Sequence, residues 1–244
     1  MSISKIQKVT TSKNTGNIWT KLPWEQPFVL PEDKDIIDDV NQNLSPEHRF
    51  HLELLPEPYY GNPDAPIILL NANPGYSPCD EKDESQPEFK QALNSLYEKQ
   101  RLNLLHEKQD YPFCLVNPAF SNTSGGDYWR RHLKELIQKF GDMTVAESVF
   151  LIEYYPYHSI CAGKMPPIPS QQYSFDLLQK AIKRNATIII IRKEKEWRKA
   201  VPELNEEYKN VWKVNNPRAG TVSIRNLPVD AWQRICNILS QRKE

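Results

Sequence analysis

The sequence contains few cysteines, and no two of them lie close together. The four are Cys79, Cys114, Cys161 and Cys236. None has the C-x-x-C spacing of zinc and iron–sulfur sites, so we expect structural thiols and neither a metal nor a cofactor. No stretch approaches the ~18 apolar residues of a membrane span. The polar N-terminus also lacks an apolar signal core, which favours a cytoplasmic protein with no membrane partner.

The chain also lacks an excess of charge of either sign. Lys and Arg together number 31, as do Asp and Glu, so the formal net charge is zero. Because phosphate contacts supply most non-specific affinity for nucleic acid, this balance predicts weak non-specific DNA binding. Local basic clusters are still candidates for a DNA-binding face, with a solvated helix surface as the alternative. The candidate DNA-binding residues are Arg130, Arg218 and Arg225.

Glycine is scarce and proline abundant, at 8 and 20 residues, which indicates long, stiff connections. What the sequence does contain is a series of short apolar runs typical of strands buried on both faces. These runs lie at 66–70, 113–116, 149–152, 186–191 and 211–214. Amphipathic stretches separate them, so we predict a three-layer α/β/α sandwich around a mainly parallel sheet. The length suits a single domain at 31–244, preceded by an irregular segment 1–30 that packs on it through Trp19, Trp24 and Phe28.

Polar or aromatic side chains follow four of the five runs. In open α/β sheets, ligands bind beyond the carboxyl ends of the strands, so these side chains should converge on one crevice. They are Asn71 and Asn73, then Asn117, then residues 153–158, and finally Asn215 and Asn216.

The end of the first run resembles the first motif of the uracil-DNA glycosylase superfamily, a hydrophobic strand closed by an Asp-Pro or Asn-Pro turn. Here the sequence is LLNANPGY, from Leu69 to Tyr76, and its Asn-Pro-Gly form is most like the mismatch-specific and single-strand-selective branches. Segments 115–129 and 211–227 resemble the family's base-reading strand with its helix and its last strand with a DNA-wedging loop. The likeness is one of order and spacing over residues 60–240, since Asn-Pro-Gly alone is a common turn former.

The resemblance implies a uracil-DNA glycosylase-like fold and an enzyme that flips a base from DNA and hydrolyses its N-glycosidic bond. It implies that Asn73 holds the attacking water and that Asn117 reads the Watson–Crick edge of the base. Where the family has His-Pro-Ser, this chain has Asn216-Pro217-Arg218. Asn216 therefore takes the place of the imidazole that assists the leaving base, and Arg218 is free to meet phosphate.

Two further residues bear on the substrate. Gly75 stands where uracil-removing members place a Tyr that blocks bases substituted at C5, so that side should be open, although glycine also suits the turn. Asp127 is either the N-cap of the following helix or an acceptor for a cytosine amino group. We count Asp127 with Asn73 and Asn216 as the candidate catalytic residues.

Rings and polar groups around these motifs complete the predicted base pocket, because aromatic side chains stack on a flipped base. One or two of the tyrosines are instead expected to pack in the core. The candidate substrate-binding residues, besides Gly75 and Asn117, are Asn71, Tyr76, Phe120, Tyr128, Glu153, Tyr155, Tyr157 and His158.

The resemblance and the open C5 side together predict a monomeric, monofunctional DNA glycosylase. Its expected substrate is a bulky 5-substituted cytosine, such as the glucosylated 5-hydroxymethylcytosine of phage DNA, removed in antiviral defence. One alternative is a repair enzyme for uracil, 5-hydroxymethyluracil or hypoxanthine. The other is a non-catalytic nucleic-acid-binding or inhibitory module on the same fold, in which Asn73 only forms a turn.

Overall fold

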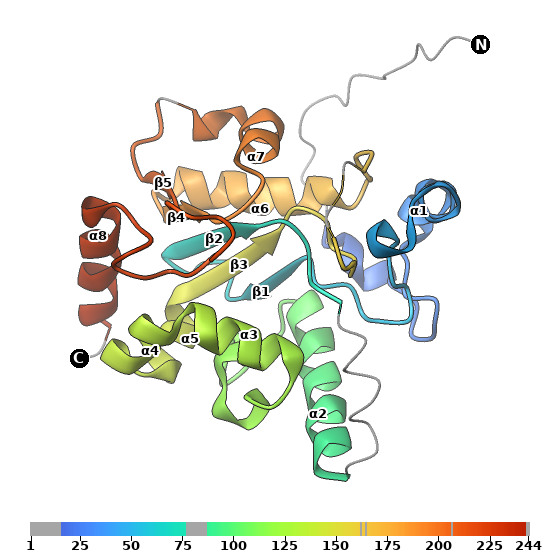
Figure 1. Ribbon diagram of the computed structural model, residues 1–244, viewed down its shortest axis with the longest axis horizontal. Coiled ribbons are helices and arrows are strands. Elements are labelled where there is room, and N and C mark those ends of the chain that lie inside the picture. The colour runs from blue at the N-terminus through green and yellow to red at the C-terminus, as the bar shows by residue number, and fades with distance from the viewer. Residues whose placement is uncertain (1–15, 77–86, 162, 164, 206, 243–244) are drawn as a thin grey trace.

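The computed structural model describes residues 16–76, 87–161, 163, 165–205 and 207–242. These residues form an α/β fold with one five-stranded mixed sheet in the order β1-β3-β2-β4-β5 (Figure 1). Strands β2 to β5 are parallel to their neighbours, and β1 pairs antiparallel with β3 at one edge. The strands are β1 (Tyr59–Gly61), β2 (Ile67–Asn71), β3 (Val149–Glu153), β4 (Thr187–Ile190) and β5 (Val211–Lys213).

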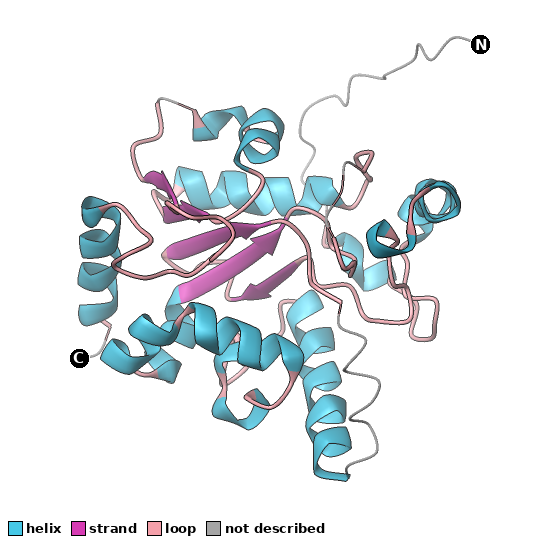
Figure 2. Ribbon diagram, in the orientation of Figure 1, coloured by secondary structure: helices cyan, strands magenta, loops and turns pink. Residues whose placement is uncertain are grey.

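Helices cover both faces of the sheet (Figure 2). Alternate side chains of β2 separate two cores: Ile68 and Leu70 pack towards α1, α6 and α7, whereas Ile67 and Leu69 pack towards α3, α4, α5 and α8. In the described residues the helices are α1 (Pro31–Asn43), α2 (Pro87–Leu104), α3 (Ser124–His132), α4 (Lys134–Phe140), α5 (Asp142–Ser148), α6 (Gln171–Lys183), α7 (Glu194–Ala200) and α8 (Val229–Ser240).

The central strands read as continuous apolar runs because both of their faces are covered. Every residue of β2, β3 and β4 is buried. Each buried Ile or Leu side chain contributes about 1.5–3 kcal/mol relative to exposure. The strands predicted around 66–70, 149–152, 186–191 and 211–214 are therefore present.

The strand predicted at 113–116 is wrong. Residues Cys114–Val116 form a short 3-10 helix, η4, in which Val116 N donates to Phe113 O and Asn117 N donates to Cys114 O. The sheet position beside β3 is taken by β1. A short apolar run has the same composition in a buried strand and in a buried helical turn, so periodicity did not separate the two.

The helix expected to begin after Asp127 instead begins at Ser124, and the helical segment that ends at Phe140 is divided at Leu133 into α3 and α4. Thr123 is the N-cap of α3, because its Oγ1 accepts a hydrogen bond from Gly126 N at 3.2 Å. The N-cap assignment for Asp127 is therefore wrong. The first turn of α3 requires glycine at position 126, because a Cβ there would lie 1.8 Å from Phe120 O.

The described part of the N-terminal segment packs on the same core as α1 and α6. Trp19 and Leu30 are buried there, whereas Trp24, predicted as an anchor, is 74% exposed. Residues 1–15 and Cys79 lie outside the described residues. Across the described chain, we found no helix with both the length and the apolar character needed to cross a bilayer.

The connections on the two sides of β2 leave a crevice at its carboxyl end. The chain passes from β2 to β3 through α2 to α5, and from β3 to β4 through α6 on the other face. As a result β3 and β4 lie on opposite sides of β2. Open α/β sheets bind their ligands at such a switch point.

Candidate functional site

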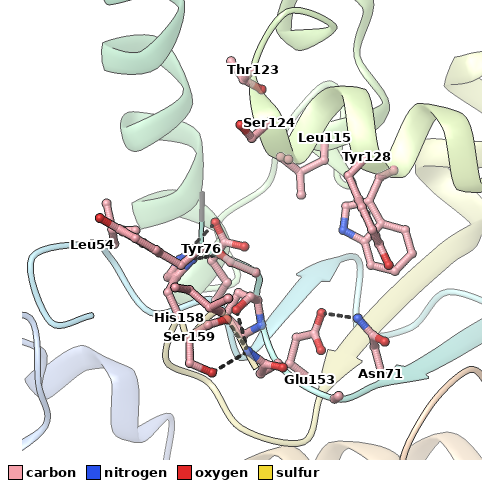
Figure 3. Close-up of a pocket in the computed structure, with 18 of the residues that line it drawn as sticks. Leu54, Asn71, Tyr76, Leu115, Thr123, Ser124, Tyr128, Glu153, His158 and Ser159 are labelled. Atoms are coloured by element: carbon pink, nitrogen blue, oxygen red, sulfur yellow. Dashed lines mark hydrogen bonds and ion pairs between the residues drawn. The ribbon is translucent and has the colours of Figure 1, made fainter. Parts of the chain in front are cut away.

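A cavity of about 1170 Å³ occupies this crevice. The turn after β2 and the segments after β3 and β4 form its floor, and side chains of α2 and α3 form its sides (Figure 3). Three parallel strands thus contribute to one site through their carboxyl ends. The sequence predicted the contributions that follow β2 and β3, but it did not predict the one that follows β4.

The side-chain amide of Asn73 is held in one orientation at the cavity wall. Its Nδ2 donates to Ser159 Oγ at 2.9 Å, to Ser159 O at 3.1 Å and to Pro74 O at 2.8 Å. Two of these acceptors are carbonyl oxygens, so the partners themselves identify the nitrogen. The side-chain oxygen, Asn73 Oδ1, accepts no hydrogen bond from another described residue, so it is available as an acceptor for a ligand.

The next residues of the turn are clamped by His158. Its Nδ1 lies 2.6 Å from Gly75 O and its Nε2 lies 3.0 Å from Leu55 O. Glu57 Oε1 lies 3.6 Å from the same Nε2 atom. His158 therefore holds the turn in place. At Gly75 a Cβ would meet no atom of the described residues within 4 Å, so that side of the cavity is open as far as these residues define it.

Glu153, the last residue of β3, is a cavity residue of which only 2% is exposed. Its Oε1 accepts a hydrogen bond from Asn71 Nδ2 at 3.0 Å, and Asn71 Oδ1 accepts one from Arg192 Nη1 at 3.1 Å. Burial raises the pKa of Glu153 to about 8; the Asn71 bond opposes this shift, the Glu57 carboxylate adds to it and Arg192 opposes it.

Sequence reasoning missed Arg192, Lys193 and Gln100 as cavity residues. Arg192 follows the apolar run 186–191, the one run whose polar sequel the sequence analysis did not count as part of the crevice. Besides Asn71, it binds the hydroxyl of Tyr128, with Nη1 at 2.8 Å from the oxygen. Gln100 reaches the cavity from α2, where its Nε2 donates to Glu57 Oε1 at 2.6 Å. A signal for Arg192 existed in its position directly after the strand.

Several of the predicted site residues come together in this cavity. Two rings among them are braced from behind, since Tyr76 stacks on His51 with centroids 3.4 Å apart and Tyr128 stacks on His132 at 3.7 Å. The predicted residues that line the cavity are Asn71, Asn73, Gly75, Tyr76, Asp127, Tyr128, Glu153, His158 and Arg218. Asp127 is exposed and pairs with Arg131 at 2.7 Å.

Three predicted aromatic residues lie in the core and do not line the cavity. Tyr157 donates its hydroxyl proton to Asp33 Oδ2 at 2.7 Å and accepts from Leu30 N at 3.1 Å. Tyr155 donates to Met165 O at 2.7 Å, and Phe120 is buried in the core on the other face of the sheet. Stacking on a base requires an accessible ring face, so the structure corrects these three assignments.

Four predicted polar residues also lie outside the cavity lining. Asn117 Oδ1 accepts from Ala119 N at 2.9 Å, and Asn216 Oδ1 accepts from Arg218 N at 3.0 Å, so both side chains cap turns of their own backbone. The guanidinium of Arg130 is engaged within the fold by Val116 O and Asp142, and Arg225 is exposed. The assignment of Asn117 fails because the strand expected before it is a 3-10 helix.

No family model matches the chain, and no curated protein or solved structure matches it. Its chemistry is therefore assigned from the cavity residues themselves. Among the described residues, no three or more His, Cys, Asp and Glu side chains are grouped to hold a metal ion.

Proposed function

We propose that the cavity takes up a pyrimidine flipped out of DNA and hydrolyses its N-glycosidic bond, on a fold of the uracil-DNA glycosylase type. The observation that carries the proposal is the Asn73 turn. It follows a fully buried strand at the switch point of the sheet, and the fixed amide leaves one oxygen available to a ligand. Helices on both faces of a mainly parallel sheet are compatible with that fold.

Asn73 has the chemistry needed to place a water molecule. Cleavage of an N-glycosidic bond passes through an oxocarbenium-like sugar, so catalysis consists of stabilising charge and positioning the attacking water. A fixed amide oxygen accepts a hydrogen bond from water and orients it. Because an amide does not remove the proton in the way a carboxylate does, the water attacks a sugar that already carries positive charge.

The shape of the cavity favours a pyrimidine with a large substituent at C5. Its volume of about 1170 Å³ exceeds the range of about 300–1000 Å³ that is usual for small-molecule sites. No atom of the described residues lies within 4 Å of a Cβ placed on Gly75, and the rings of Tyr76 and Tyr128 line the cavity, where aromatic side chains suit stacking on a base. Glucosylated 5-hydroxymethylcytosine of phage DNA, removed in antiviral defence, is the substrate that best uses this room.

Cationic side chains at the cavity suit a phosphate backbone despite the zero net charge. Arg131, Lys193 and Arg218 all contribute to its lining. The loop after β5 that carries Arg218 also exposes 57% of Ile224, an apolar side chain placed where the resemblance expects a DNA-wedging loop. Phosphate contacts position DNA, and the cavity then reads the base.

The test is incubation of the protein with three DNAs, followed by alkali to cleave abasic sites. The DNAs carry glucosylated 5-hydroxymethylcytosine, ordinary bases only, or uracil. We expect strand breaks only in the glucosylated DNA. Breaks confined to uracil DNA would favour a repair enzyme, and DNA binding without breaks in any substrate would favour a non-catalytic module.

A further inference from the structure

The carboxyl group of Glu153 is only half satisfied, although it is buried in the cavity wall. Its Oε1 accepts from Asn71 Nδ2, but its Oε2 has no hydrogen-bond partner in the described part of the chain and no exposure to solvent. Buried polar atoms without partners are rare in folded proteins, and each calls for a reason such as a catalytic role. A base that enters the cavity deeply enough to reach Oε2 would supply the missing partner.

The neighbours of Glu153 determine which oxygen carries a proton. Asn71 presents its amide nitrogen to Oε1, because its own oxygen accepts from Arg192. Oε1 is therefore the acceptor, and the proton of a neutral carboxyl group lies on Oε2. Burial favours this neutral form by raising the pKa of Glu153 to about 8.

Charged groups from two other parts of the fold act on this carboxyl group. Arg192 approaches from the end of β4, and Glu57 approaches from the segment before β1. Glu57 is itself bound by Gln100 of α2 and lies 3.6 Å from His158. The nearby Glu57 carboxylate disfavours a second negative charge, so it helps Glu153 to keep its proton.

We propose that Glu153 is the general acid of the reaction, donating its Oε2 proton to a departing cytosine base. This inference rests on the proposed function. Uracil leaves as an anion whose charge spreads over two carbonyl groups, whereas cytosine has one carbonyl and an amino group and is a poorer anion. An enzyme that removes a cytosine therefore needs a proton donor at the base, and the cavity provides one buried carboxylic acid at the end of β3.

The proton balance of this step is complete without a cofactor. The electrons of the C1′–N1 bond pass to the base while the Oε2 proton moves to its N3, so the base leaves neutral. Water held by Asn73 forms the new bond to C1′ and releases one proton, and the Glu153 carboxylate takes up one proton after the base has left the cavity. Hydrolysis thus restores the starting enzyme.

The experiment measures single-turnover rates between pH 6 and 9 for the wild type and Glu153→Gln. Two DNAs that carry the same glucosylated hydroxymethyl group are used, one on cytosine and one on uracil. Glutamine keeps an oxygen for Asn71 but has no acidic proton. Thermal unfolding and binding to abasic DNA establish that the variant is folded. The pH profile of the wild type tests the proposal independently of the variant.

For cytosine, we expect the wild-type rate to fall about tenfold per pH unit above pH 8, and the variant to be about a hundredfold slower or more with a flat profile. Any cleavage of the uracil DNA should be much less affected. A flat wild-type profile, a similar fall in the variant, a variant within threefold of wild type, or equal losses on both bases would overturn the inference. Failure of the wild type to release either base would overturn the proposed function itself.

Discussion

Asn73 and Asn117 each begin an Asn-Pro dipeptide at the end of an apolar run, yet their side chains have different roles in the fold. The Asn73 amide reaches across the cavity wall to Ser159, 86 residues further along the chain. The Asn117 side chain accepts from Ala119 N, two residues away. One side chain joins two strand ends, and the other closes its own turn.

The strand before each dipeptide explains the difference. Residues of β2 pair with both β3 and β4, so the turn that follows is held between two neighbouring strand ends. Residues Cys114–Val116 curl into a 3-10 helix and pair with no strand. An Asn-Pro sequence therefore marks a turn, and the pairing of the preceding residues decides whether that turn belongs to a site.

The largest expected effect contrasts the two asparagines directly. Asn73→Ala removes the oxygen proposed to hold water and should slow base release about a hundredfold or more. Asn117→Ala removes only a cap, which should cost about 1 kcal/mol of stability and leave the rate unchanged. Single-turnover kinetics and urea unfolding measure both quantities. Equal rates for the two variants would contradict a catalytic role for Asn73 that Asn117 lacks.

Gly75 at the cavity and Gly126 in the first turn of α3 provide a second comparison between a residue of the site and a residue of the fold. Gly75→Tyr should fold normally, since a Cβ there meets no atom of the described residues within 4 Å, and the new ring should fill that side of the cavity. We expect a loss of about tenfold or more on glucosylated DNA, and a smaller loss on DNA with unglucosylated 5-hydroxymethylcytosine.

The matched control for this prediction is Gly126→Ala. Its Cβ would lie 1.8 Å from Phe120 O, so the melting temperature of this variant should be strongly lowered. Its cleavage of both DNAs should fall together. Melting temperatures and cleavage rates test both variants. If Gly75→Tyr cleaved both DNAs like the wild type, the C5 group would not occupy the space beside Gly75.

The Asn-Pro dipeptide at Asn216 lies between these two extremes and predicts the smallest effect. Asn216 caps its own turn as Asn117 does, but the next-but-one residue, Arg218, lines the cavity. Arg218→Ala should weaken DNA binding several-fold and lower the slope of log affinity against log salt by about 1. Arg225→Ala, outside the cavity lining, is the control. Identical salt slopes for the two variants would contradict a phosphate contact at Arg218.

The sequence predicted the parts of the fold that follow from burial on two faces. β2, β3 and β4 are continuous apolar runs, and the polar residues directly at or after their ends, Asn73 and Glu153, do reach the cavity. Strand 113–116 failed because four apolar residues fit a helical turn equally well.

Side-chain direction beyond the strand ends was not predictable from the sequence. Glu153, Tyr155 and Tyr157 alternate along the chain, but only the first lines the cavity, because the chain bends away from the sheet after β3. The core position of Tyr157 depends on Asp33, 124 residues away, and that of Tyr155 depends on Met165, 10 residues away in a proline-rich loop. Such partners become apparent only in three dimensions.

The central claim is that the cavity around Asn73 releases a modified cytosine, and mass spectrometry of the released base tests it most directly. In reactions of the wild type and of Asn117→Ala, the amount of free glucosylated 5-hydroxymethylcytosine should equal the amount of abasic sites formed. Asn73→Ala should produce little of either product. Folded wild-type protein that leaves every base attached, or an Asn73→Ala variant as active as the wild type, would contradict the account.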